Sequence, residues 1–334
     1  MKNQTNLINI FKFFSALLVV SIHTRLFEDV NSTLSLVFTK VISDIAIPFF
    51  LIVSGYFYIK SLNTSKKFPL AYLKKILIIY SLWSLIYIPY QLIFVNYNLS
   101  IFEKIKFVLS NYFIYGSMYH FWYFPALVIC ILTTWGFAKI NKLNIAAIAS
   151  IVIYIIGVLG CSYYSIGSKI PFLNILYSSS QFTHIRRIFF MSLPFFLIGY
   201  FINKYFEKLV KLKDALWKIG IVILFLFAFE MILVFSLNLQ INVIITFMLY
   251  PLGTVIFVIC LLFNIQMYKE TDMFFRKTSN ITYYSHPLII ILITTLGNII
   301  GFKVSPTILF VLTCGFLIIF SAVYFKISLR INKQ

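Results

Sequence analysis

Runs of apolar residues, each about as long as a membrane-crossing helix, recur along almost the whole chain. A helix needs about 20 such residues to cross the hydrocarbon of a bilayer. The chain is 61% hydrophobic and only 11% charged, whereas about a quarter of a typical soluble domain is charged. This apolar surplus is too large to bury in one aqueous core, so the sequence predicts an all-α integral membrane protein.

The lengths of the runs predict about ten transmembrane helices in a single transmembrane domain over residues 1–334. The expected spans are Leu7–Thr24, Val41–Tyr58, Leu70–Phe94, Tyr119–Phe137, Ile145–Cys161, Arg187–Ile202, Leu216–Ser236, Ile241–Phe263, Ile281–Ile300 and Thr307–Tyr324. A re-entrant or interfacial helix is also expected around Ile101–Asn111.

The basic residues orient this bundle. Lys plus Arg number 28 against 9 Asp plus Glu, and they fall between the apolar runs, which indicates cytoplasmic loops and not a nucleic-acid partner. With the N-terminus inside, 19 of the 28, including Lys2 and Lys333, lie in cytoplasmic segments. The other side receives Arg25, Lys40, Lys104, Lys106, Lys169, Arg186, Arg187 and Lys303. We therefore expect both termini to be cytoplasmic in a multi-pass protein of the plasma membrane.

The four cysteines lie in or beside apolar runs and form no C-x-x-C pair, so we expect them to pack in the interior without a disulfide or a metal site. The ionisable residues at membrane depth are more informative, because each costs about 3 kcal/mol there and is a candidate for function. They are Lys12, His23, Glu230 and His286, with His120, His184, Arg186 and Arg187 at the outer boundary.

Lys12 and His23 are eleven residues apart, which places both on one face of a helix, separated by about 16 Å along its axis. The helix would then carry a cation near the cytoplasm and a titratable imidazole near the exterior. The alternative is a lysine that extends to the interface and an interfacial histidine.

Physical grounds alone suggest a kinked packing helix in one further segment and an interfacial position for another. Pro48 removes a helical hydrogen bond, and Ser54-Gly55 permits close approach of a second helix. The aromatic run around His120 suits the membrane interface.

Five motifs occur in an order and spacing that resemble the acyltransferase-3 family of membrane acyltransferases over essentially the whole chain. They are Lys12-x10-His23, Pro48-Phe49-Phe50-x3-Ser54-Gly55, His120-Phe121-Trp122-Tyr123-Phe124, Leu193-Pro194-Phe195-Phe196-Leu197-Ile198-Gly199-Tyr200 and Ser279-Asn280-Ile281-Thr282-Tyr283-Tyr284-Ser285-His286-Pro287-Leu288. Within the family, the chain is most similar to the membrane domain of vancomycin-resistance serine racemases.

The resemblance implies a ten-helix bundle that moves an acyl group, with acetyl the expected one, from cytoplasmic acyl-CoA to a hydroxyl of a cell-envelope glycan or its lipid-linked precursor. It also implies that the first-span pair of a basic residue and His23 is essential, although Lys12 stands where the family usually has arginine. The alternative is a small-molecule transporter for a solute such as L-serine. We expect it less, because the chain stops at Gln334 without a racemase domain.

Under this interpretation His23 is the catalytic residue, either as the general base for the acceptor hydroxyl or as a transient acyl carrier. Lys12 would hold the anionic groups of CoA. His120 would orient the acceptor or His23, or be an ordinary interfacial histidine. Arg186 and Arg187 would bind an anionic acceptor, such as a diphosphate-linked sugar, or anchor the outer boundary.

Two buried residues have less defined roles. Glu230 must be neutralised or paired, for example by Arg187 or a histidine, and is either a substrate-binding residue or a structural one. His286 is expected near the cytoplasmic end of its span, too far from His23 to share a proton. It would be a packing residue or lie on the CoA side.

Overall fold

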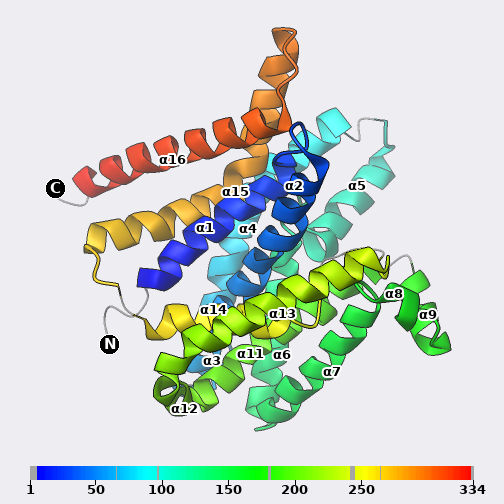
Figure 1. Ribbon diagram of the computed structural model, residues 1–334. Helices are drawn as coiled ribbons and strands as arrows, with labels where there is room; N and C mark the ends of the chain where they lie inside the picture. The colour runs from blue at the N-terminus through cyan, green and yellow to red at the C-terminus, as the bar shows by residue number, and fades with distance from the viewer. Residues whose placement is uncertain are drawn as a thin grey trace. The chain divides into compact units, whose positions relative to one another are not determined.

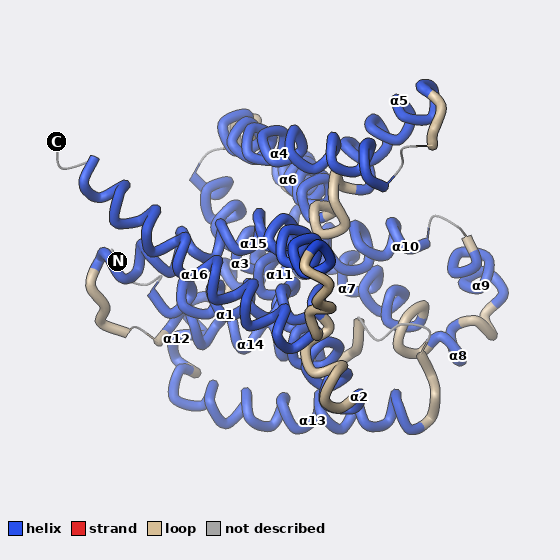
Figure 2. The backbone as a smooth tube through the Cα atoms, turned by 90° about the horizontal axis from the view of Figure 1, so that it is seen from above, coloured by secondary structure: helices blue, strands red, loops and turns tan. Residues whose placement is uncertain are grey.

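The computed structural model describes residues 6–64, 66–95, 98–179, 182–240, 245–263 and 265–331. These residues form helices joined by loops and turns (Figure 2). They group into two compact units. Unit 1 contains Met1–Phe50, Glu207–Leu237 and Asn242–Gln334, and unit 2 contains Leu51–Phe206 and Asn238–Ile241.

Unit 1 holds the helices at both ends of the chain. Its helical elements are α1 (Asn6–Thr24), α2 (Ser32–Leu36), the π-helix η1 (Val37–Ile42), the 3₁₀ turn η2 (Ser43–Ile45), the start of α3 (Ala46–Thr64), most of α12 (Phe206–Lys211), the 3₁₀ turn η6 (Lys213–Ala215), α13 (Leu216–Ser236), α14 (Leu249–Leu262), α15 (Lys269–Ile299) and α16 (Pro306–Ile331). In Figure 1, α1, α15 and α16 lie side by side.

Unit 2 is built from the middle of the chain. Its helical elements are the rest of α3, α4 (Leu70–Tyr90), the π-helix η3 (Gln91–Val95), α5 (Ile101–Ser110), the π-helix η4 (Asn111–Tyr115), α6 (Tyr123–Lys139), α7 (Leu143–Leu159), α8 (Tyr164–Gly167), α9 (Pro171–Ser178), α10 (Phe182–Ile185), the π-helix η5 (Arg186–Ser192) and α11 (Leu193–Lys204). The expected helix around Ile101–Asn111 is present as α5, whose N-terminus is closed by a capping box between Ser100 and Glu103.

The all-helical character predicted from the sequence is confirmed in the described residues. Six helices are long and apolar enough to cross a membrane, and three shorter apolar helices accompany them. Each of the ten predicted spans falls on one or more helices. The number of crossings and the cytoplasmic position of both termini stay predictions. Lys2 and Lys333, used to orient the chain, and the expected span start at Ile241 lie outside the described residues.

Two helices begin earlier than their hydropathy indicates. The helical segment that was expected to start at Val41 runs from Ser32 to Leu62, and its first turn is capped by the Asn31 side chain, which accepts the Leu34 amide at 2.9 Å. Helix α15 starts at Lys269 and not at Ile281, with Glu270 and Asp272 in its first turn, where the helix dipole favours acidic side chains.

Helices α1 and α15 run in the same direction, and polar contacts fix their register. The Asn6 amide donates to the Ile265 carbonyl at 2.9 Å, and the Asn9 amide donates to the Asp272 carboxylate at 2.8 Å. Further along, Ser279 Oγ donates to the backbone carbonyl of Lys12 at 3.1 Å. Residue numbers therefore rise together on both helices, so the C-terminal half of α1 lies beside the middle of α15.

The segment after α1 is tied to the start of α16. The Asp29 carboxylate accepts hydrogen bonds from the backbone amide and the hydroxyl of Thr307, in the first turn of α16. These bonds hold the pKa of Asp29 below its usual value. The contact anchors the loop that follows His23.

In unit 2, α3 and α11 cross with their backbones in contact at Gly55 and Gly199. A Cβ atom on Gly55 would lie 1.9 Å from the Phe196 carbonyl oxygen, and one on Gly199 would lie 2.5 Å from the Tyr56 amide nitrogen. The close helix approach predicted at Ser54-Gly55 is confirmed, and it belongs to the small-residue packing common between membrane helices.

We predict that Gly55→Ala lowers the stability of the protein by about 2 kcal/mol or more, because the added methyl group meets backbone that cannot move aside as a side chain would. The measurement is the midpoint temperature of unfolding of the purified protein in detergent. Gly136→Ala, in α6 of the same unit, is the matched control, since its Cβ would meet nothing within 4 Å. A Gly55→Ala protein as stable as this control would contradict the crossing.

Candidate active site

The imidazole rings of His23 and His286 stack on each other in unit 1. Their centroids are 5.2 Å apart and their planes are inclined by 23°. His23 is the penultimate residue of α1 and is half-buried, whereas His286 lies in the middle of α15 and is fully buried. The first-span histidine therefore faces a second histidine within the protein.

The backbone around Pro287 fixes the orientation of His286. Proline has no amide hydrogen, so the Tyr283 carbonyl, four residues before Pro287, lacks its usual helical donor. His286 Nδ1 lies 3.1 Å from that oxygen and 2.9 Å from the Thr282 carbonyl oxygen. A carbonyl only accepts, so Nδ1 carries the proton and Nε2 carries the lone pair in the neutral ring.

The prediction that His286 lies far from His23 is wrong. It assumed a span that begins at Ile281, which would place His286 close to the cytoplasmic end. Because α15 begins at Lys269 and is in register with α1 through Asn9 and Ser279, His286 instead reaches the level of the C-terminal end of α1.

Helices α1 and α15 carry several fully buried hydroxyl groups. Ser15 on α1 and Thr278, Ser279 and Thr282 on α15 are each 0% exposed. Among the described residues, the side-chain oxygens of Ser15, Thr278 and Thr282 have no hydrogen-bond partner. Unsatisfied buried hydroxyls are costly, so these groups give the two helices capacity to bind a polar group.

Lys12 lies nearer the N-terminal end of α1. Its side chain is half-buried, and its backbone carbonyl accepts the Ser279 hydroxyl. Lys12 and His23 both belong to the single unbroken helix α1, as the sequence predicted.

Glu230, near the C-terminal end of α13, is 5% exposed and caps another helix. Its Oε1 accepts the Phe247 amide and its Oε2 accepts the Met248 amide, both at 2.7 Å. These two amides immediately precede α14, so the carboxylate lies at the positive end of that helix dipole. Of the two predicted roles, this geometry favours the structural one; pairing with Arg187 or a histidine stays a prediction.

In unit 2, His120 is 4% exposed and lies among aromatic rings. Its ring centroid is 5.6 Å from that of Tyr87 and 4.0 Å from that of Phe121. Phe121, Trp122 and Phe124 of the aromatic run are buried within the protein, so most of the run packs against other residues; its position at the membrane interface stays a prediction. Any role of His120 toward an acceptor stays a prediction.

The turn that carries His120 is fixed by a glycine and by contacts with α4. Gly116 has a φ of 91°, and a Cβ atom there would lie 2.3 Å from the Trp122 amide nitrogen. The Ser117 hydroxyl hydrogen-bonds with that of Ser84 at 2.6 Å, and its amide donates to the Tyr80 hydroxyl at 3.0 Å.

Arg186 and Arg187 open the π-helix η5 of unit 2. The Arg187 guanidinium lies 5.4 Å from the centre of the Trp122 ring, a cation–π contact. Arg186 is 6% exposed and lies against the Cys161 thiol. His184, just before them, packs on Tyr115 with ring centroids 4.0 Å apart.

The four cysteines are buried and free, as predicted.

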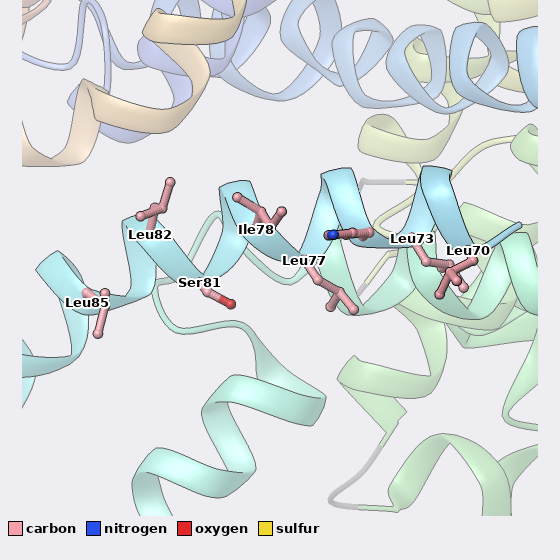
Figure 3. Close-up of a pocket in the computed structure, with 8 residues that line it drawn as sticks. Leu70, Leu73, Leu77, Ile78, Ser81, Leu82 and Leu85 are labelled. Atoms are coloured by element: carbon pink, nitrogen blue, oxygen red, sulfur yellow. The ribbon is translucent and has the colours of Figure 1, made fainter.

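A groove of about 750 Å³ runs along α4 but has the character of a lipid-facing surface (Figure 3). The described residues that line it are Leu70, Leu73, Lys74, Leu77, Ile78, Ser81, Leu82 and Leu85. Only Lys74 and Ser81 among these eight have polar side chains. Since substrate sites need converging polar groups, we place the chemistry elsewhere.

These observations define a multi-pass membrane protein with ionisable residues buried among its helices. Residues 6–326 match the acyltransferase-3 family through its acyltransferase domain, so the chain belongs to this family of membrane acyltransferases. The match covers all five motifs identified in the sequence.

Curated relatives carry racemase names. An amino-acid racemase of Enterococcus faecalis is 29% identical over 350 residues, which cover 100% of this chain and 48% of the relative. A serine/alanine racemase of Enterococcus gallinarum is 28% identical over 228 residues, covering 65% of this chain and 31% of the relative. The chain thus spans about half the length of the first relative, and its match covers about a third of the second. No solved structure matches the chain.

Sequence reasoning missed the contact between His23 and His286 and the stacking of Arg187 on Trp122. The carbonyl left without a donor by Pro287 is a sequence signal that could have indicated a local role for His286 Nδ1. The Trp122–Arg187 contact has no such signal, because it joins segments 65 positions apart.

We predict that Glu230→Gln lowers stability by about 3 kcal/mol, because the amide cannot accept from both Phe247 and Met248 and no longer carries the charge that the start of α14 favours. The measurement is the unfolding midpoint in detergent. Glu207→Gln, at an exposed position, is the control and should change little. Unchanged stability with a loss of substrate binding would return Glu230 to the substrate-binding role.

Proposed function

We propose that the protein is a membrane O-acyltransferase that moves an acyl group, with acetyl the expected one, from cytoplasmic acyl-CoA to a hydroxyl of a cell-envelope glycan or its lipid-linked precursor. Membership of the acyltransferase-3 family supports acyl transfer in general. The observation that carries the specific proposal is the stacked pair of His23 and His286, because it positions a titratable group within the bundle.

In this mechanism His23 is the general base. Its unprotonated ring nitrogen takes the proton of the acceptor hydroxyl while the hydroxyl oxygen attacks the thioester carbonyl carbon. The tetrahedral intermediate then collapses, the C–S bond breaks, and the CoA thiolate receives a proton from the imidazolium. The products are the acyl ester and free CoA. In a second version of the same chemistry, His23 carries the acyl group itself before the acceptor arrives.

His286 would hold the His23 ring in place. Its own ring is fixed by the Thr282 and Tyr283 carbonyls, so its face is a rigid surface for His23 to stack on. A general base contributes most when its geometry is set before the substrate binds.

Lys12 would attract the phosphate groups of CoA to the other end of α1. The buried hydroxyls of Ser15, Thr278 and Thr282 would offer hydrogen bonds to the polar arm of the thioester. In unit 2, His120 would orient the acceptor, and Arg186 and Arg187 would bind its anionic part. A substrate-binding role for Glu230 is not needed in this mechanism.

A second candidate function is transport of a small amino acid such as L-serine. The observation that favours it is that the relatives are named amino-acid racemase and serine/alanine racemase. In that case, binding would be expected without CoA.

We predict that His23→Ala reduces acyl transfer at least about 100-fold, because a general base typically contributes that much or more. The assay supplies acetyl-CoA with a radiolabelled acetyl group to the purified protein in vesicles that contain envelope glycan precursors, and measures label on the glycan. Lys218→Met, at an exposed position of α13, is the control and should transfer the acyl group as the wild type does. Labelled serine uptake that requires no CoA, with no acetylated glycan, would instead establish the transporter.

A separate prediction concerns Lys12. Lys12→Met should raise the KM for acyl-CoA about tenfold and change kcat little, since it removes a charge that contacts the donor away from the reacting atoms. Lys12→Arg should retain a low KM, because the positive charge remains. Equal effects of both variants on kcat, with KM unchanged, would place Lys12 outside the donor site.

A further inference from the structure

Arg186 and Arg187 are two permanent charges in an apolar environment. A guanidinium does not lose its proton in proteins, so neither residue can become neutral as a histidine can. The Arg186 residue is only 6% exposed, and Arg187 is half-buried with its guanidinium over the Trp122 ring. The two side chains are close enough to repel each other electrostatically.

Unit 2 offers almost nothing to balance these charges. Glu103 is the one acidic residue in its sequence. That carboxylate is fully exposed and occupied at the start of α5, where it accepts the amide and the hydroxyl of Ser100. Among the described residues of unit 2, no carboxylate forms an ion pair with either arginine.

A buried charge that stays unbalanced is strongly unfavourable, and at membrane depth it is rare. We propose that Arg186 and Arg187 form a binding site for a phosphate-bearing group with about two negative charges, such as a diphosphate. The forked guanidinium groups match phosphate oxygens in pairs. Trp122 holds one of the forks in position.

The charge balance distinguishes this ligand from a free amino acid. A zwitterion such as serine has no net charge to offset two arginines, and its ammonium group would need an acidic or aromatic partner. The single carboxylate of unit 2 is already engaged with Ser100. The site therefore favours a phosphate-linked substrate over an amino acid. Only the assignment of that substrate as the acyl acceptor rests on the proposed function.

The test measures binding directly, without any assay of acyl transfer. Inorganic pyrophosphate is titrated into the purified full-length protein in detergent at about 150 mM salt, which screens weak attraction to the basic surface. Affinity is read by calorimetry, and stability by the unfolding midpoint. We expect pyrophosphate to raise the midpoint of the wild-type protein. Arg187→Gln should weaken its binding at least about tenfold.

The same variant has a second readout. Without ligand, Arg187→Gln should be as stable as the wild type or more so, because it removes a repelling charge from the buried pair. An arginine with a purely structural role would give the opposite result. Lys169→Gln, at an exposed position of unit 2, is the matched control and should retain full binding. If Arg187→Gln does not fold, Arg187→Lys replaces it; this variant keeps the charge, loses the forked geometry and should show intermediate affinity.

Competition identifies the source of the phosphate. Displacement of pyrophosphate by farnesyl diphosphate but not by coenzyme A indicates a lipid-linked acceptor, and displacement by coenzyme A indicates the donor; both support the site. Equal pyrophosphate binding by wild type and Arg187→Gln would overturn it, as would serine binding that depends on Arg187. His23→Ala should bind pyrophosphate normally, so a protein without acyl transfer but with Arg187-dependent binding would refute only the proposed function.

Discussion

The cost of placing polar groups in an apolar environment governs the local structure of this protein. His286 shows one solution, because its ring proton is satisfied by a carbonyl that Pro287 has left without a donor. Glu230 shows another, since two backbone amides at the start of α14 receive its carboxylate. In both cases the partner is backbone, which is present at every position and needs no second charged residue.

Hydropathy predicted where the helices lie but not where they begin. The expected helix at Ile101–Asn111 is present, and the close helix approach expected at Ser54-Gly55 is found, with α11 as the partner that the sequence did not identify. The early starts of α15 and of the segment from Ser32 were missed for a physical reason. Hydropathy marks the residues that lipid can cover, whereas a helix continues through polar residues for as long as caps and backbone hydrogen bonds support it.

In the candidate site, too, one feature could be predicted from local sequence and another could not. Placing Lys12 and His23 on one face needed only the helical period, which the sequence contains in full. Bringing His23 to His286 needed the register between α1 and α15, which is set by contacts such as Asn6 with Ile265 and Asn9 with Asp272. These pairs are more than 250 positions apart, so no local pattern could reveal them.

The chemical difference between imidazole and guanidinium separates the two clusters. A buried histidine can remain neutral, so the stacked pair of His23 and His286 is compatible with burial. A buried arginine remains charged and must receive its counter-charge from elsewhere. Eight of the nine acidic residues of the chain belong to unit 1, which leaves the arginines of unit 2 with little internal compensation. The two proposals follow this division, with proton transfer proposed for unit 1 and anion recognition proposed for unit 2.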